Sequence, residues 1–403
     1  MNPSTDKLRF LVNLIPIKKG GGQQVALNFV ENLEILRSDH PQIEWYATVT
    51  EGTYIHRHLE KQSTFVKFFQ FPSNPVRRLL QENRRLSQIV DEHGIDLVYT
   101  MFGPSVPPLG IPTITGCAYS NLFFPEIDFW GKHSWKNRTK AKLIDKFRLS
   151  RTLAADAIVF ENESMLERAV SLFNYPREKT IYIPPSISLD KGKDDDSFDY
   201  GPIRQRCQAI QGSDNLLMLT GWHKNKNIEL SPAILQALVA EDSDANIVIT
   251  IPPDHPGAIR LMQEAAQLGV EKRLIFFGSV APQEVKILFQ SIRAVLLLSL
   301  LESFSNNIIE SWVYERPLII SDEAWSRALC GDSVVYVERN NPVDIARKAV
   351  ALLRDEKLYG EIVKKGNEKR QEYPSPSEKV RRQILFLLDI VHAEKMVLSS
   401  EKL

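Results

Sequence analysis

The sequence is poor in cysteine, has no net charge and contains no long hydrophobic run, and each absence argues against a class of protein. Its three cysteines, Cys117, Cys207 and Cys330, are odd in number and far apart among 403 residues, which argues against a disulfide framework. Lysine plus arginine equals aspartate plus glutamate at 50 each, so no global field attracts nucleic acid. No run reaches the roughly 18 apolar residues of a membrane span. We therefore expect a cytoplasmic protein without a nucleic-acid partner.

Short apolar runs rich in branched residues recur along the whole chain, each followed by a longer segment with helical spacing of its apolar residues. This alternation is typical of an α/β protein with parallel sheets. The strands expected in a first sheet are 8–15, 43–50, 65–71, 95–101, 113–117 and 156–160. Those expected in a second sheet are 216–220, 246–251, 274–278, 294–298, 318–321 and 334–337.

The length of the chain, with 43% apolar residues, suggests two large domains rather than one core. The boundary is expected in a stretch that contains a Pro-Pro pair, a glycine and a run of three aspartates. We therefore expect an N-terminal domain over 1–185, a linker or insertion over 186–212 and a C-terminal domain over 213–375. The segment 376–403 is expected to form a helix that packs back toward the first domain.

The most informative motif follows the fourth strand of the second series. Glu302 lies at the carboxyl end of that strand, where ligands bind in open α/β sheets. Residues 305–308 would form the first turn of a helix, whose free N–H groups and positive dipole end suit a diphosphate. Glu310 lies about one turn further on, where its carboxylate can accept two hydrogen bonds from ribose hydroxyls. The simpler alternative is that Ser303 or Ser305 caps the helix and both glutamates are solvated.

Together with its flanking strands and Pro317, this motif closely resembles the donor site of glycosyltransferase family 4, a group of retaining enzymes with the GT-B fold. In that family two glutamates separated by seven residues follow the strand, as Glu302 and Glu310 do here. A small-aromatic-small tripeptide follows the first glutamate. The donor-binding residues that the resemblance implies are Ser303, Phe304, Ser305, Asn306 and Glu310, with Glu302 as a catalytic residue at the transferred sugar or its phosphate.

The resemblance also implies the architecture and the reaction. The GT-B fold has two Rossmann-like, doubly wound domains that face each other across a cleft. The reaction is transfer of a sugar from a nucleoside diphosphate sugar to an acceptor, with retention of configuration. It uses neither a metal nor a cofactor beyond the nucleotide sugar as co-substrate.

Two glycine-containing turns agree with this interpretation. The strand 274–278 ends in Gly278, and the family holds the nucleotide base with backbone groups of this turn, here up to Val280. Near the N-terminus, a loop containing Gly21 and Gly22 follows the first strand, where the family has a glycine-rich loop that faces the phosphates and the acceptor. A dinucleotide fingerprint is absent because Val25 stands where its third glycine would be. A flexible turn is the alternative for the N-terminal loop.

The sequence departs from the family pattern at two places. Trp222 stands where members usually carry an arginine that contacts the donor phosphates, and no counterpart exists for the histidine that many members place after the strand 113–117. We expect Lys226, helped by Lys224, to neutralise the diphosphate in place of the arginine. Trp222 would then stack on the donor or pack the turn, and the alternative for both lysines is an ordinary surface position.

The segment 132–151 is strongly basic in an otherwise neutral chain. It predicts a surface for an anionic membrane or for a lipid-diphosphate acceptor, and a solvated helix face is the alternative. The residues expected on this acceptor or membrane side are Lys136, Arg138, Lys140 and Lys142. The expected partners are therefore a nucleotide-sugar donor, a lipid-linked or cell-surface glycan precursor as acceptor, and the inner face of the membrane.

Other functions remain open at this level. Since two family residues are missing, the same fold could serve as a non-catalytic nucleotide-sugar-binding or scaffolding protein. A nucleotide-sugar hydrolase or epimerase is a third possibility. The aspartates 194–196 resemble a metal-binding Asp-x-Asp, but they fall in the expected linker, so a solvated loop and no metal site are expected.

Overall fold

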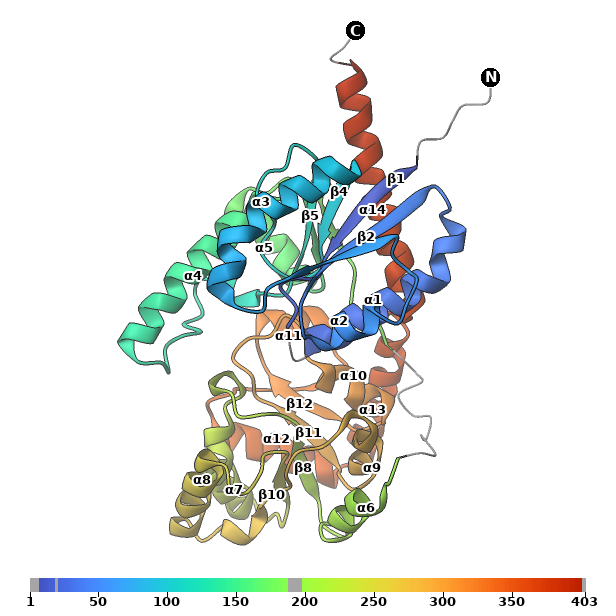
Figure 1. Ribbon diagram of the computed structural model, residues 1–403. Coiled ribbons are helices and arrows are strands. Elements are labelled where there is room, and N and C mark those ends of the chain that lie inside the picture. Colours follow the sequence, from blue (N-terminus) through green and yellow to red (C-terminus); the bar gives the residue numbers. More distant parts are fainter. Residues whose placement is uncertain (1–6, 19–20, 188–197, 401–403) are drawn as a thin grey trace. The chain divides into compact units, whose positions relative to one another are not determined.

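The computed structural model describes residues 7–18, 21–187 and 198–400, and the chain divides into two compact units. Unit 1 contains Met1–Ser186 and Pro374–Leu403, and unit 2 contains Ile187–Tyr373. The two units are shown in Figure 1, and each is described by itself below. Part of the glycine-containing loop, residues 19–20, and the aspartate run 194–196 lie outside the described residues.

Within the described residues, unit 1 is built on a parallel sheet with the strand order β3-β2-β1-β4-β5-β6-β7. The strand order reverses between β1 and β4, and their carboxyl ends therefore form a switch point of the kind at which α/β sheets bind ligands. The strands are β1 Leu8–Asn13, β2 Ile43–Thr50, β3 Lys67–Phe71, β4 Leu97–Thr100, β5 Thr113–Cys117, β6 Ala157–Phe160 and β7 Thr180–Tyr182. The helices are α1 Gly21–Leu36, α2 Tyr54–Leu59, α3 Pro75–His93, α4 Trp135–Leu153, α5 Glu163–Phe173 and α14 Pro376–Ser400.

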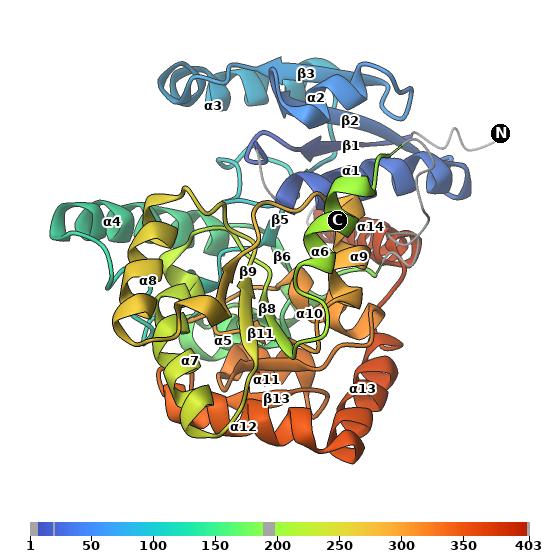
Figure 2. The same cartoon turned by 90° about the horizontal axis from the view of Figure 1, so that it is seen from below.

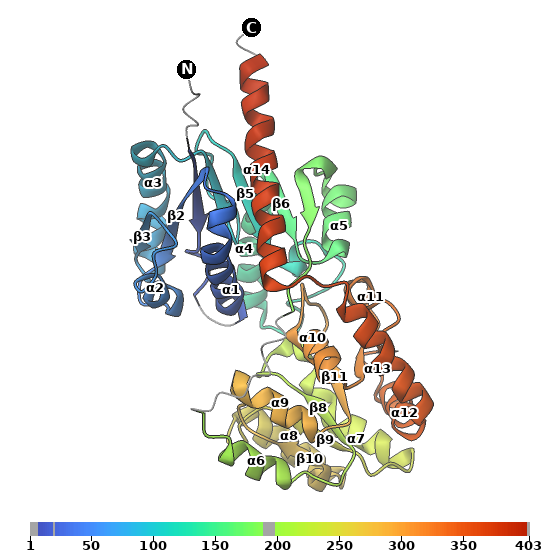
Figure 3. The ribbon, with the colours of Figure 1, turned by 90° about the vertical axis from the view of Figure 1, so that its right-hand side faces the viewer.

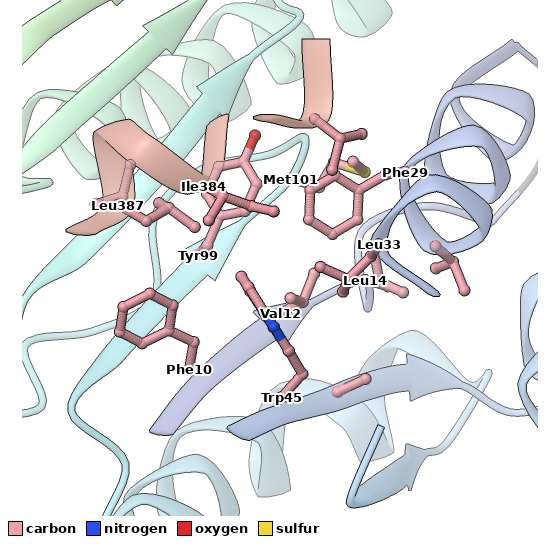
Figure 4. Packing of buried hydrophobic residues seen from close by; sticks show 14 of the residues in the cluster. Phe10, Val12, Leu14, Phe29, Leu33, Trp45, Tyr99, Met101, Ile384 and Leu387 are labelled. Carbon is pink, nitrogen blue, oxygen red and sulfur yellow. The ribbon is translucent and has the colours of Figure 1, made fainter. Parts of the chain in front are cut away.

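The core of unit 1 lies on both faces of this sheet because successive side chains of a strand point to opposite faces. Phe10 and Val12 of β1 point to one face, while Leu11 belongs to the cluster on the other. On the first face they pack with Phe29 of α1 and Ile384 of α14 (Figure 4). Helices α1 and α14 lie side by side on this face (Figure 3). The C-terminal helix is therefore a structural part of unit 1.

Unit 2 repeats the design with the strand order β10-β9-β8-β11-β12-β13. Helices α7, α8 and α12 pack together on one face of its sheet, and α10 packs against β11 on the other (Figure 2). The strands are β8 Asn215–Met218, β9 Asn246–Ile249, β10 Leu274–Phe276, β11 Ala294–Leu297, β12 Leu318–Ser321 and β13 Val335–Val337. The helices are α6 Gly201–Gln208, α7 Ser231–Ala240, α8 Pro256–Gln267, α9 Val285–Gln290, α10 Asn306–Val313, α11 Ala324–Cys330, α12 Pro342–Arg354 and α13 Glu356–Arg370.

The predicted α/β class with two parallel sheets is confirmed, and every strand predicted in the two series is present within a few residues of its expected limits. The stretch 186–212 differs from the expected linker. Its residues 201–208 form α6, which packs against α9 through the buried side chains of Ile203 and Cys207. Residues four positions apart lie on the same face of a helix, so Ile203 and Cys207 can pack together against α9. Two apolar residues are too few to give a helical period in the sequence.

Candidate active site

The switch point of unit 2 lies between β8 and β11, because the strand order runs outward from β8 in one direction and from β11 in the other. The loop after β8 and the loop after β11 therefore meet at the carboxyl edge of the sheet. The first carries Trp222, Lys224 and Lys226, and the second carries Glu302 and the residues that precede α10. Four of the residues predicted for the donor site, namely Trp222, Lys224, Lys226 and Glu302, thus lie on the two loops that the topology brings together.

Asn225 ties these two loops to each other. Its side-chain amide donates to the carbonyl oxygen of Leu301 at 2.8 Å, and its side-chain oxygen accepts from the N–H of Leu301 at 3.1 Å. The backbone N–H of Leu300 also donates to the carbonyl oxygen of Asn225, at 2.9 Å. The side chain of Asn225 thus mimics a strand partner for the second loop. This role was not predicted, since a polar loop residue carries no periodic signal.

Lys226 and Glu302 form an ion pair at this junction. Lys226 Nζ lies 2.6 Å from Glu302 Oε1, and only 18% and 15% of the two side chains are exposed. Asn225 donates a further hydrogen bond to the same carboxylate oxygen at 3.2 Å. Because the pair is largely removed from water, each partner depends on the other for compensation of its charge. The ammonium group and the carboxylate are therefore held in fixed positions at the edge of the sheet.

The backbone of the loop explains why Lys226 points there. Lys224–Lys226 form one 3₁₀ turn, in which the N–H of Lys226 donates to the carbonyl oxygen of His223 at 2.9 Å. Asn227 then takes a left-handed conformation with φ 56°, which asparagine tolerates better than most residues. Its side chain is held by the carbonyl oxygen of Arg339 at 2.8 Å. Within this turn Lys224 is exposed, whereas Lys226 is turned toward Glu302.

Helix α10 begins directly beside this pair. Ser305 is its N-cap residue by position, but within the described residues its side chain accepts no capping hydrogen bond. A capping serine thus does not compete with a ligand for the first-turn N–H groups. Asn307 in the first turn is buried and donates to the carbonyl oxygen of Leu219, after β8, at 2.9 Å. This bond fixes the start of α10 against the loop that carries Lys226.

The remaining residues of the motif surround the start of α10. Ser303 and Phe304 are partly buried, Asn306 is exposed, and the ring of Phe304 lies 6.2 Å from that of Tyr373. Glu310 is partly buried one turn further along the helix. Burial and, to a smaller extent, the negative charge of Glu310 together raise the pKa of Tyr314 to about 12. Glu310 and Tyr314 therefore lie near each other, in the second half of α10 and at its C-cap.

Trp222 packs the turn. Its ring stacks on His255 with 4.9 Å between centroids and 27° between planes. It also lies directly on Gly257, the second residue of α8, where a Cβ atom would come within 2.3 Å of the indole. Gly257 is therefore required by the close approach of this ring. Of the two alternatives for Trp222, the structure places it against α8, in packing contact.

Gly278 lies at the other end of the same sheet edge, after β10. Its φ of 86° favours glycine, and the N–H groups of Phe277 and Gly278 donate to the carbonyl oxygens of Ile249 and Ile251. Strands lie about 4.8 Å apart, so three steps put β10 roughly 14 Å from β11. An extended nucleoside diphosphate can bridge this distance, with Val280 in the turn at its far end.

Arg206 of α6 holds this turn, and this role was missed because α6 was expected to be linker. Its guanidinium donates to the carbonyl oxygens of Phe277 at 3.2 Å and Ser279 at 3.0 Å. It also pairs with Glu284 at 3.2 Å, whose second oxygen accepts from the N–H of Ala281 at 2.7 Å. The turn is thus closed from both sides by charge-assisted hydrogen bonds.

Replacing Arg206 by methionine should loosen the turn 277–281, because three hydrogen bonds are lost, two of them partly buried. We expect a loss of about 1–3 kcal/mol in the free energy of opening of this turn. Hydrogen exchange measured by mass spectrometry should show faster exchange in peptides that cover it. The matched control is Arg204→Met, an exposed arginine on the same helix. Equal exchange in the two variants would contradict the role assigned to Arg206.

The other predicted residues lie in unit 1. Gly21 and Gly22 begin α1, and a Cβ atom at Gly22 would make only an ordinary contact of 3.6 Å with Ile17. The predicted basic segment forms α4. Lys136, Lys140 and Lys142 are exposed there, and Arg138 pairs with Asp128 at 2.8 Å. Among the described residues, no group of three or more His, Cys, Asp or Glu side chains could hold a metal ion, and no helix is long and apolar enough to cross a membrane.

Comparison with known proteins connects this geometry to an enzyme class. Residues 204–369 match the family model of glycosyl transferases group 1. An uncharacterised glycosyltransferase of Methanocaldococcus jannaschii is 23% identical over 220 residues. That match covers 53% of this chain and spans about half, 55%, of the length of the relative.

Two solved structures share the fold over nearly the whole chain. A glycosyltransferase from Rickettsia africae has a TM-score of 0.68 at 16% identity and covers 96% of this chain and 99% of its own. The Anabaena protein HepE, solved in complex with UDP and glucose, has a TM-score of 0.61 at 14% identity, with 98% and 100% covered. These likenesses confirm the predicted GT-B fold with two Rossmann-like domains. With the domain match, they support a glycosyltransferase enzyme.

Proposed function

We propose that this protein transfers a sugar from a nucleoside diphosphate sugar and that unit 2 holds the donor. One observation carries the proposal: the buried Lys226–Glu302 pair lies at the switch point of a domain that matches glycosyl transferases group 1. A fixed cation, a carboxylate and a helix N-terminus lie within one edge of the sheet, and this combination suits a sugar diphosphate.

Each part of the donor has a proposed partner. The diphosphate binds at the start of α10, with Lys226 beside it and Lys224 in support. Glu302 contacts the transferred sugar, and Glu310 accepts hydrogen bonds from the ribose. The turn at Gly278 and Val280 receives the base through backbone groups. Ser303, Phe304, Ser305 and Asn306 line the stretch between the sugar and the diphosphate.

The proposed mechanism is electrostatic. Negative charge develops on the leaving diphosphate, and Lys226 together with the N–H groups of α10 stabilises that charge more in the transition state than in the ground state. Retention of configuration and independence of metal are part of this proposal, as in glycosyltransferase family 4. Trp222, which packs against Gly257, carries no charge. The positive charge beside the diphosphate is therefore assigned to Lys226.

A screen of nucleotide sugars by thermal stabilisation tests the donor, because a ligand that binds only the native state raises the melting temperature. UDP-glucose is the first candidate, since HepE was solved with UDP and glucose. Release of nucleoside diphosphate from the best ligand then tests turnover. Binding without turnover with any acceptor would favour a scaffolding protein, and release of free sugar or of an epimer would favour the hydrolase or epimerase.

The acceptor proposed is a lipid-linked or cell-surface glycan precursor, met at an anionic membrane surface by α4. Four large apolar side chains of α4 are exposed among its basic residues, namely Trp135, Leu143, Ile144 and Phe147. Exposed apolar and basic side chains on one helix suit a surface position on anionic lipid.

Removing four of these charges should weaken vesicle binding. We expect the variant with Lys136, Arg138, Lys140 and Lys142 changed to glutamine to lose most of its co-sedimentation with anionic vesicles, since each basic residue near the surface contributes about 1 kcal/mol. Binding of the unchanged protein should fall as salt is added. Neutral vesicles are the control, and equal co-sedimentation of the two proteins with anionic vesicles would sink the membrane proposal.

A further inference from the structure

A cavity lies wholly within unit 1, at the switch point of its sheet. It has a volume of about 540 Å³, a size in the range of small-molecule sites. Its walls are the loop after β1, the loop after β4, and the facing sides of α3 and α4. The two loops approach each other at Pro16 and Gly103. The approach requires glycine, since a Cβ atom at Gly103 would lie only 2.8 Å from the proline ring. The cavity thus occupies the position at which an α/β sheet binds a ligand.

One side of this cavity is cationic. Lys18, Arg78, Arg148 and Arg151 line it, against a single lining carboxylate, Glu82. Burial lowers the pKa of Lys18, and the nearby charge of Arg78 lowers it further. Burial likewise lowers the pKa of Arg151 and raises that of Glu82. In all three groups, burial disfavours the charged form. A bound anion would stabilise the charged forms of Lys18 and Arg151.

The cations are held in place by neighbouring groups. Arg148 lies 4.4 Å above the ring of Tyr119 and 3.3 Å from Asp145. That carboxylate is engaged by two other donors, Asn121 at 2.7 Å and Trp130 at 2.6 Å. On the facing helix, Arg78 Nε lies 3.3 Å from Glu82 Oε2, and the buried Nη1 atom of Arg78 makes no hydrogen bond within the described residues. Guanidinium donors therefore face the cavity from both α3 and α4.

The other side of the cavity is apolar and continues onto the surface. Val106 and Pro107 form its inner wall, and Ile144 and Phe147 of α4 form its rim. Ile144 and Phe147 are also 40% and 59% exposed, next to the exposed Leu143. An apolar path thus leads from the cations to the outside of α4. A free inorganic anion would gain nothing from these apolar side chains, whereas an apolar chain attached to the anion would be buried against them.

We propose that this cavity binds the acceptor as a phosphate joined to an apolar chain, with the phosphate among Arg78, Arg148 and Lys18 and the chain along Ile144 and Phe147. The proposal rests on the glycosyltransferase function proposed above and names the chemistry of its acceptor. It assigns the recognition of that acceptor to residues outside the four basic positions predicted from the sequence.

The test uses the full-length protein and octyl phosphate below its micelle concentration, with affinity measured by titration calorimetry. Octyl phosphate should bind at least tenfold more tightly than inorganic phosphate, since burial of two methylene groups already gives about that factor. It should also bind more tightly than octyl glucoside, which has the chain without the charge. Equal affinity for octyl phosphate and either control ligand would overturn the proposal.

Two cavity variants locate the site. Arg148→Gln should weaken octyl phosphate by about tenfold, the usual effect of losing one hydrogen bond to a charged group. Phe147→Ser should weaken octyl phosphate while leaving inorganic phosphate unchanged. Lys146→Gln, an exposed charge on the same helix, is the matched control. If Arg148→Gln loses structure by circular dichroism, Lys18→Gln replaces it, and unchanged affinity in the folded variants would overturn the assignment.

UDP binding measured in parallel separates this proposal from the donor function. Arg148→Gln and Phe147→Ser should not alter it, because the partners proposed for the donor in unit 2 lie outside this cavity. Binding of octyl phosphate without binding of any nucleoside diphosphate would refute the donor function and leave the cavity site standing. The reverse outcome would leave the donor function standing and refute the cavity site.

Discussion

Replacing Lys226 by alanine should reduce turnover of the donor by on the order of 10²–10³-fold, the usual loss when one preorganised group that stabilises developing charge is removed. Nucleoside diphosphate affinity should fall by a smaller factor, because the charge of the leaving diphosphate is greatest in the transition state. Steady-state kinetics with the donor found by the thermal screen, compared with titration calorimetry of the nucleoside diphosphate, gives both numbers.

The ion pair between Lys226 and Glu302 also allows a test with a double variant. In Lys226→Ala, Glu302 remains largely buried without its cation and repels the diphosphate. Changing Glu302 to glutamine in the same chain should therefore recover part of the lost diphosphate affinity, although turnover stays low. Such coupling is expected only of residues in contact. If both single changes simply add, the pair does not act on the ligand as a unit.

Lys224→Ala is the matched control for Lys226→Ala, since both lysines belong to the same 3₁₀ turn. Lys224 is exposed, so its loss should reduce turnover only mildly. A Lys226→Ala enzyme with the turnover of the unchanged protein would show that the phosphate is neutralised elsewhere.

The architecture could be predicted from the sequence because strands and helices leave a local signal. Buried parallel strands are short runs of branched residues, and each of the twelve predicted runs became a strand. The strand β7, Thr180–Tyr182, was missed because none of its residues is fully buried, so it lacks the buried apolar run of the other strands. Helix α6 was missed because it has few apolar residues and follows a stretch rich in turn signals. Short elements whose stability comes from tertiary packing do not carry their own pattern.

The sequence named candidate residues for a donor site, but it did not indicate the contacts among them. Lys226 and Glu302 are 76 positions apart, and their pairing follows from the adjacency of β8 and β11. Asn225, which fixes both loops, is one polar residue in a loop of polar residues. The packing of Trp222 on Gly257 of α8 is likewise a contact that no pattern in the sequence indicates. Contacts between distant segments depend on topology, which one sequence specifies only indirectly.

The acceptor side was harder to predict for the same reason. The basic density of the segment 132–151 drew attention to its exposed lysines. The cations that line the cavity of unit 1 come from three separate segments, at Lys18, Arg78 and the end of α4. No motif in the sequence links these three segments to one another, and they converge only through the switch point between β1 and β4.

Replacing Glu310 by alanine should weaken nucleoside diphosphate binding by on the order of 10–100-fold, because a carboxylate that accepts two hydrogen bonds contributes about 1.5–3 kcal/mol or more. Glu302→Gln should mainly reduce transfer, because Glu302 is proposed to contact the transferred sugar. It should not weaken diphosphate binding, since the change removes a negative charge near the diphosphate. Titration calorimetry with UDP measures the first effect and steady-state kinetics the second. Glu361→Ala, an exposed glutamate on α13 of the same unit, is the control for loss of charge.

The ribose contact itself can be tested by changing the ligand as well as the protein. If Glu310 accepts from the ribose hydroxyls, 2′-deoxy-UDP should bind the unchanged protein about tenfold more weakly than UDP, the expected loss for one hydrogen bond to a charged group. The Glu310→Ala protein should bind the two ligands almost equally, because the partner of the missing hydroxyl is already gone. The position of Glu310 one turn into α10, beyond Ser305 and the diphosphate, is the reason to expect this coupling at the sugar of the nucleotide. A Glu310→Ala protein that still prefers UDP as strongly as the unchanged protein would mean that another residue binds the ribose.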